Sequence, residues 1–279
     1  MTTNLRTVPV SAAIILLFGG IRQLAWLIFG FSMMFFWVFV LQADVSGIFF
    51  TGKIVEQEGT VIAAFETDAS ENERSVYINF YSFVTPDGTA HESQSYASGK
   101  SFKKGETVKV EYPEGKPQYS RIVGMRRKMF GPGALFIAIF PLGALIALYF
   151  AMKSSIRRFR LVQKGILARA VCRTIEATNT TVNSNPVQQM VFCFKDNSGN
   201  DFEVSYNTQN PGETGDEADV LYLESNPEKA TLLDALPSRI RFNKQGDVDS
   251  VPLKPVLWTA LIPFLTIFGH GGTLLRLLL

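Results

Sequence analysis

Residues 129–152 of this chain read MFGPGALFIAIFPLGALIALYFAM, and no charged side chain interrupts them. A helix rises about 1.5 Å per residue, so about 20 residues cross the roughly 30 Å hydrocarbon core of a bilayer. This stretch is therefore long enough to span a membrane. It lies near the middle of the 279 residues, with a polar segment on each side and another apolar segment beyond each of those. We interpret the chain as a membrane protein organised around this central segment.

The composition supports this interpretation and excludes several classes of protein. Hydrophobic residues make up 47% and charged residues 19%, and the mean hydropathy of +0.13 differs from that of an ordinary soluble domain. A net charge of +2 is too small to indicate a nucleic-acid partner. Two histidines and two cysteines are too few and too scattered for a zinc site. We expect Cys172 and Cys193 to be free thiols in strands rather than a disulfide.

Two further apolar segments lie outside the polar ones. Residues 24–41, LAWLIFGFSMMFFWVFVL, are uncharged and long enough to span. Residues 8–20 are a shorter apolar run that resembles a signal peptide, but Arg22 and the longer run follow at once. We interpret this run as a lead-in helix that lies at the interface or extends the span; a separate crossing, as half of a helical hairpin, is the alternative. Residues 255–275 predict a third span, which Pro263 weakens as a helix.

The polar segment from residue 51 to residue 128 alternates apolar and polar side chains at period two, as half-buried strands do. The turn sequence Thr85-Pro-Asp-Gly88 predicts a β-hairpin. We predict about five strands, which fold into a small antiparallel barrel or sandwich and include residues 60–65, 75–84, 91–96, 106–112 and 119–123.

The segment from residue 153 to residue 250 repeats this order, with strands predicted in residues 190–195, 201–206, 219–223 and 230–233. At an offset of 111 the two segments share identical residues, which are Thr67 and Thr178, Asn72 and Asn183, Phe83 and Phe194, and Gly88 and Gly199. With one residue removed, Val110-Glu-Tyr112 falls on Val220-Leu-Tyr222. Such self-similarity indicates two modules of one design, joined by the central membrane segment.

These motifs resemble a bacterial membrane family catalogued as domain of unknown function 3592, with two copies of its β module. The motifs that carry the resemblance are residues 85–88, 110–117 and 120–127 in the first module, and residues 177–187 and 232–237 in the second. The resemblance covers nearly the whole chain. It implies a membrane protein with β modules, and it implies no reaction, ligand or catalytic residue.

Candidate catalytic residues are few. His91, Ser93 and Ser95 share one face of a predicted strand beside Glu92, and these are the residue types of a Ser-His-acid triad. No nucleophile elbow accompanies them, and at the offset of 111 His91 falls on Phe202. We therefore expect no catalytic residue, no cofactor-binding residue and no metal ligand.

Four other features have structural interpretations that we favour. The acidic loop at residues 213–219 lacks the spacing of a calcium loop, and we expect it to be solvated. Residues 99–105 lack the spacing of a P-loop and predict a hairpin cap. The alternate aromatics from Tyr77 to Phe83 predict a core face rather than a platform for bases or sugars. We expect His270, between glycines, to be an interfacial residue at a helix end rather than a functional polar position in the membrane.

Basic residues cluster on both sides of the central segment. Each such residue attracts anionic headgroups by about 1 kcal/mol. We expect lipid headgroups near Arg126, Arg127, Lys128, Arg157, Arg158 and Arg160. A span normally has one basic flank, so two basic flanks leave the orientation of this segment open.

Two topologies remain. Arg6 and Arg22 against Asp44 favour an N-terminus inside the cell, which would put the first module outside and the second inside. Alternatively, Phe140-Pro-Leu-Gly143 turns the central segment back as a re-entrant segment, and both modules share one side.

The predicted fold combines membrane α-helices with two duplicated antiparallel β modules. Its segments are residues 1–50 (lead-in and first membrane segment), 51–128 (first module), 129–152 (central membrane segment), 153–250 (second module) and 251–279 (third membrane segment). We expect a non-enzymatic, multi-pass protein of the bacterial inner (plasma) membrane that presents its modules for protein interaction or assembly, with a protein partner or as a homo-oligomer. A membrane-bound hydrolase that uses His91 and a transport-associated subunit are the alternatives.

Overall fold

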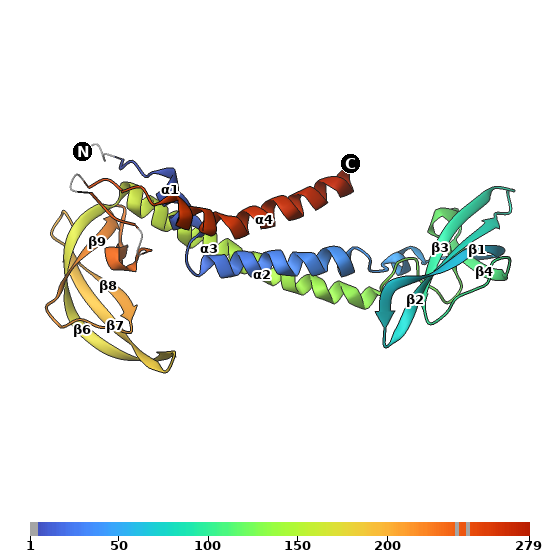
Figure 1. The fold of residues 1–279 in the computed structure, drawn as a ribbon, viewed down its shortest axis with the longest axis horizontal. Helices are drawn as coiled ribbons and strands as arrows, with labels where there is room; N and C mark the ends of the chain where they lie inside the picture. The colour runs from blue at the N-terminus through green and yellow to red at the C-terminus, as the bar shows by residue number, and fades with distance from the viewer. Residues whose placement is uncertain (1–4, 238–239, 244–245) are drawn as a thin grey trace. The chain divides into compact units, whose positions relative to one another are not determined.

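The computed structural model describes residues 5–237, 240–243 and 246–279. The chain divides into two compact units, one formed by residues 31–142 and the other by residues 1–30 together with residues 143–279. Each unit contains a five-stranded antiparallel sheet, and helices supply most of the remaining regular structure (Figure 1). The prediction of two antiparallel sheets combined with apolar helices is thus confirmed.

The first sheet has the strand order β3-β2-β1-β4-β5. Its strands are β1 (Ile54–Glu71), β2 (Arg74–Val84), β3 (Ala90–Ser98), β4 (Thr107–Pro113) and β5 (Arg121–Ile122). The predicted turn joins β2 to β3, and there Gly88 has a φ of 83° and donates its N–H to the Thr85 carbonyl at 2.9 Å. The sheet curls until β3 meets the chain that follows β5, where Tyr96 and Arg126 exchange backbone hydrogen bonds of 2.7 and 3.0 Å. This pairing nearly closes the sheet into a barrel.

The second sheet has the order β10-β9-β6-β7-β8. This order matches that of the first sheet when the first sheet is read from β5 to β3, so that β6 corresponds to β1 and β7 to β2. Its strands are β6 (Ile166–Val182), β7 (Asn185–Lys195), β8 (Asp201–Thr208), β9 (Glu217–Leu223) and β10 (Asn226–Leu232). Both sheets therefore place their longest strand at the centre and connect it to the next strand by a two-residue hairpin.

The irregularities of the two sheets also coincide at the offset of 111. Strand β1 has bulges between Val61 and Ala63 and between Glu66 and Ser70, and β6 has them between Cys172 and Thr174 and between Ala177 and Thr181. The hairpin turns hold both residues at positive φ, in Asn72-Glu73 and in Asn183-Ser184. The buried positions of the second strand match as well, and they are Val76, Asn79, Tyr81 and Phe83 in β2 and Val187, Met190, Phe192 and Phe194 in β7. A bulge or a left-handed turn is specified locally, so this agreement extends the repeat seen in the sequence.

Among the described residues, three helical stretches are long and apolar enough to cross a membrane: Arg22–Val40, Pro132–Lys164 and Leu253–Leu278. The first consists of α2 (Arg22–Phe35) and a π-helical turn, the second of a 3-10 turn and α3 (Ile139–Lys164), and the third is α4 (Leu253–Leu278). Pro141 lies in the first turn of α3, where a proline is tolerated better than in a helix interior. The chain therefore continues as helix through the point where a re-entrant turn was the alternative. Pro263 lies inside α4 without ending it.

Residues 8–20 form a helix, as predicted, but its surroundings differ from the prediction. Helix α1 (Val10–Phe18) ends at Gly19 and Gly20, and Gly20 has a φ of 70°, so α1 does not extend the span. Its Ala12, Ile15 and Leu16 are buried in a core that also contains side chains of α3, β9 and the start of α4. One face of the helix is therefore part of the core of its own unit, and its position at the membrane interface stays a prediction.

Helices α2 and α4 contact each other within this unit. The Gln23 amide lies 3.3 Å from the Thr259 carbonyl, and further along both helices the His270 Nε2 lies 2.9 Å from the Gly30 carbonyl. A Cβ added at Gly30 would be 2.7 Å from the Thr266 hydroxyl, so the two backbones approach closely. Residue numbers rise together along the two helices, which means that α2 and α4 run in the same direction.

Candidate functional site

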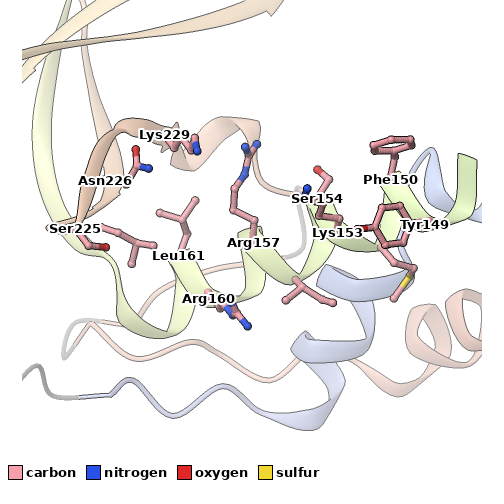
Figure 2. Close-up of a pocket in the computed structure, with 13 residues that line it drawn as sticks. Tyr149, Phe150, Lys153, Ser154, Arg157, Arg160, Leu161, Ser225, Asn226 and Lys229 are labelled. Carbon is pink, nitrogen blue, oxygen red and sulfur yellow. The ribbon is translucent and has the colours of Figure 1, made fainter. Parts of the chain in front are cut away.

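The second half of α3 and the β9–β10 hairpin, from Leu223 to Lys229, line a groove with a volume of about 790 Å³ (Figure 2). Two aromatic and four basic side chains line it together with aliphatic and neutral polar ones. Those used below are Tyr149, Phe150, Lys153, Arg157, Arg160 and Lys229.

The helical repeat explains how α3 contributes most of these side chains. Lys153, Arg157 and Arg160 are spaced at i, i+4 and i+7, which places them along one side of the helix. Leu161 and Val162 are buried at 1% and 0% exposure and fix the end of α3 against its own unit. Helix α3 stops where the Gly165 N–H meets the Leu161 carbonyl at 2.7 Å, and the chain enters β6 directly.

The charges of the groove are not neutralised by the protein. Lys153, Arg157, Arg160 and Lys229 are all exposed, and none makes a hydrogen bond or ion pair with any residue in the described part of the chain. Four cations along one groove repel one another and attract an anion. The arrangement is therefore suited to binding an anionic group.

The basic residues before α3 are placed differently. Arg126 forms an ion pair of 2.8 Å with Glu71, and Arg127 donates a hydrogen bond of 3.1 Å to the Ser120 carbonyl. Lys128 is exposed, whereas Arg158 is half-buried and does not line the groove. Among the six residues expected near headgroups, Arg157 and Arg160 are thus the two that the groove brings together. Headgroup contact at each of the six stays a prediction.

The structure does not bring His91 and Ser95 of the candidate triad together. The His91 ring stacks on Phe83 with centroids 5.4 Å apart, and Ser95 is fully buried, where its hydroxyl accepts the Ile122 N–H at 2.9 Å. Four residues along an extended strand separate His91 from Ser95 by roughly 13 Å, far beyond hydrogen-bond reach. Both side chains have structural contacts that account for their positions.

The acidic loop is likewise engaged by its own surroundings. Asp216 accepts the Glu213 N–H at 2.7 Å, and Arg169 lies 3.7 Å from Glu217 and 3.6 Å from Asp219. Across residues 5–237, 240–243 and 246–279 no group of three or more His, Cys, Asp or Glu side chains is arranged to hold a metal ion.

The remaining candidates also have structural roles. Gly99 and Gly105 take positive φ values at the two ends of residues 99–105, which were predicted to cap a hairpin. Phe83 is buried in the hydrophobic core of the first sheet. His270 lies inside α4 rather than at its end and contacts α2. Both cysteines are free, and burial is the main cause that raises the pKa of each thiol, which makes a reactive thiolate unfavourable at neutral pH.

The sequence indicated only one wall of the groove. The spacing of the basic residues after the central segment identified the α3 wall, but Lys229 is separated from Arg157 by 72 positions (229 minus 157) and no local pattern connects them. In comparisons with known proteins, no family model matches this sequence and no curated protein is significantly similar to it.

Proposed function

We propose that this chain is a non-enzymatic, multi-pass protein of the bacterial inner membrane that presents two duplicated β modules for protein interaction or assembly. The observation that carries the proposal is the repetition of one β design, including its bulges and left-handed turns, before and after a helix of membrane-spanning length. Among the candidate catalytic residues, the His91 ring stacks on Phe83, and the Ser95 hydroxyl accepts the Ile122 N–H. A duplicated scaffold that presents two β surfaces favours a binding role.

The direction of α2 and α4 supports a topology for this protein. If both helices cross the bilayer in the same direction, the chain must cross back between them, and α3 is the helix of sufficient length that does so. We propose that α3 spans fully, which exposes the first module on one side of the membrane and the second module on the other. Arg6 and Arg22 precede α2 and Asp44 follows it. Because basic flanks are usually cytoplasmic, this distribution favours a cytoplasmic N-terminus and an external first module.

Cysteine accessibility in intact cells tests this topology. The two β-hairpin turns supply matched positions, because Pro86 and Asn197 are both exposed and correspond at the offset of 111. In a background with Cys172→Ser and Cys193→Ser, we expect an impermeant maleimide to label Pro86→Cys from outside. Asn197→Cys should be labelled only after the cells are permeabilised. Equal labelling of both positions in intact cells would instead support the re-entrant arrangement.

The outer face of the first module carries an apolar feature suited to a protein partner. Phe65 on β1 is 61% exposed, and its ring contacts Phe80 on β2 with centroids 6.2 Å apart. The equivalent position in the second module is Glu176, which is also exposed. Exposed aromatic residues are enriched in interfaces, so the first module is the better candidate for a stable protein contact.

Site-specific photo-crosslinking in cells tests the interaction. A photoreactive residue at position 65 should give a discrete product with a partner protein or a second copy of this chain. The same residue at position 176 is the matched control and should give less of that product. A protein that remains an uncrosslinked monomer at both positions contradicts the proposed role.

A further inference from the structure

We propose that the groove between α3 and the β9–β10 hairpin binds the headgroup of a phospholipid that carries two phosphates. The inference rests on the proposed membrane insertion of α3. It goes beyond that proposal because it assigns one defined lipid site, whereas the sequence indicated only a general attraction of anionic headgroups to the basic residues. The order of groups along α3, the origin of the cations in two walls, and the lack of protein partners for those cations among the described residues favour such a site.

Along α3 the order of side chains matches the order of groups in a phospholipid. The helix carries no charge up to Met152, and Lys153 is the first cation after the uncharged stretch. Tyr149 and Phe150 lie at one end of the groove, where the hydrocarbon gives way to the interface, and aromatic rings are favourable at that depth. Arg157 and Arg160 follow one and two turns later. An acyl chain can therefore lie beside the aromatic end while its headgroup reaches the cations.

Two separate walls supply the charges. Figure 2 shows Arg157 directed from α3 toward the β9–β10 hairpin, where β10 carries Asn226 and Lys229. An anion between these walls would contact a guanidinium on one side and an ammonium on the other. Arginine favours bidentate contacts with phosphate, and lysine supplies a compact charge. Asn226 and Ser225 add neutral polar groups at the same end.

The number of cations favours a headgroup with two phosphates over one with a single phosphate. Four cations line the groove, and within the described residues no carboxylate pairs with any of them. A single phosphate would leave most of this charge uncompensated, whereas two phosphates compensate about half of it. The aromatic end favours a lipid over a free phosphate compound, which would have no group to place there.

Retention of lipid by the full-length protein tests this site. The protein is reconstituted in phosphatidylcholine nanodiscs that contain increasing fractions of cardiolipin, and bound lipid is counted by native mass spectrometry after release from the disc. We expect one cardiolipin per chain to be retained in preference to phosphatidylglycerol. The double variant Arg157→Gln/Lys229→Gln should bind cardiolipin roughly 30-fold more weakly, since each lost cation near a membrane surface weakens binding about fivefold.

The matched control removes two exposed cations that flank membrane segments but do not line the groove, in Lys164→Gln/Lys254→Gln. This control should retain cardiolipin like the wild type, and Arg157→Lys/Lys229→Arg should recover most of the binding. Equal loss in the control would show diffuse attraction and overturn the proposal, as would unchanged binding in Arg157→Gln/Lys229→Gln. Displacement of the bound species by inorganic pyrophosphate alone would assign the groove to a soluble phosphate and also overturn it. Stable incorporation into lipid discs is scored separately, so a failure of membrane insertion is distinguishable from a failure of the lipid site.

Discussion

Replacing Gly30 by alanine should separate α2 from α4. The added Cβ would lie 2.7 Å from the Thr266 Oγ1, closer than a methyl group tolerates, so either the buried Thr266 side chain or one of the helices must shift. Overpacking of this kind costs about 1–3 kcal/mol, and the gain in helix propensity from glycine to alanine returns at most about 1 kcal/mol. We expect a net loss of about 1–2 kcal/mol and a weaker contact between His270 and the Gly30 carbonyl.

The protein contains a matched control for this substitution. Gly143 lies inside α3, and a Cβ added there meets no atom within 4 Å, so Gly143→Ala should be neutral or stabilising. Both variants are compared with the wild type by reversible unfolding of the full-length protein in mixed micelles with increasing detergent denaturant. If Gly30→Ala is no less stable than Gly143→Ala, then α2 and α4 are not packed as described.

A double-mutant cycle locates the source of the loss. Thr266→Ala removes the hydroxyl that the new methyl group would meet. Combining Gly30→Ala with Thr266→Ala should therefore recover about 0.5–2 kcal/mol relative to the sum of the single variants. Simple additivity would place the strain somewhere other than this contact.

Three further predictions concern the β modules and their connections. Tyr81→Phe removes a buried hydrogen bond of 3.0 Å to the Ser120 hydroxyl and should lower the free energy of unfolding by about 1–2 kcal/mol in chemical denaturation. For Asp44, burial acts to raise the pKa, but hydrogen bonds from Ser46 and from a backbone N–H outweigh it, so the folded pKa lies below the usual value. Its stabilising contribution is therefore present above the unfolded pKa and is lost as pH falls through the folded pKa, and Asp44→Asn should flatten that acid dependence in thermal unfolding curves. Because burial raises the pKa of both thiols, iodoacetamide at pH 7 should modify the half-exposed Cys193 slowly and the buried Cys172 only after unfolding, as read by mass spectrometry.

Much of the β structure could be predicted because its signals are local. Alternation at period two located strands such as β2 and β8, and the Thr85-Pro-Asp-Gly88 turn located the hairpin between β2 and β3. The last strand of the first module was predicted as residues 119–123 but comprises only Arg121–Ile122. A 3-10 turn begins at Pro117, and this turn takes up the start of the predicted strand.

The features that the sequence did not reveal depend on contacts between distant residues. The apolar character of α1 is equally compatible with lipid and with a protein core, and only its packing with residues beyond 160 distinguishes the two. The groove was missed because its second wall, which includes Lys229, is distant in sequence from α3. The contact of His270 was missed because its partner Gly30 lies 240 positions away. Composition alone carries no information about such pairings.

The contact between α2 and α4 also constrains how the protein is made. Residues 1–30 are synthesised early, yet the unit they belong to is otherwise built from residues 143–279. Until α4 leaves the ribosome, α1 lacks Val256 as a neighbour, and Gly30 faces neither Thr266 nor His270. More than 200 residues are therefore synthesised between α2 and α4, and α2 lacks its packing partner during that time. A chain interrupted before residue 253 would retain both sheets but expose this unfinished surface to the chaperones and proteases of the membrane.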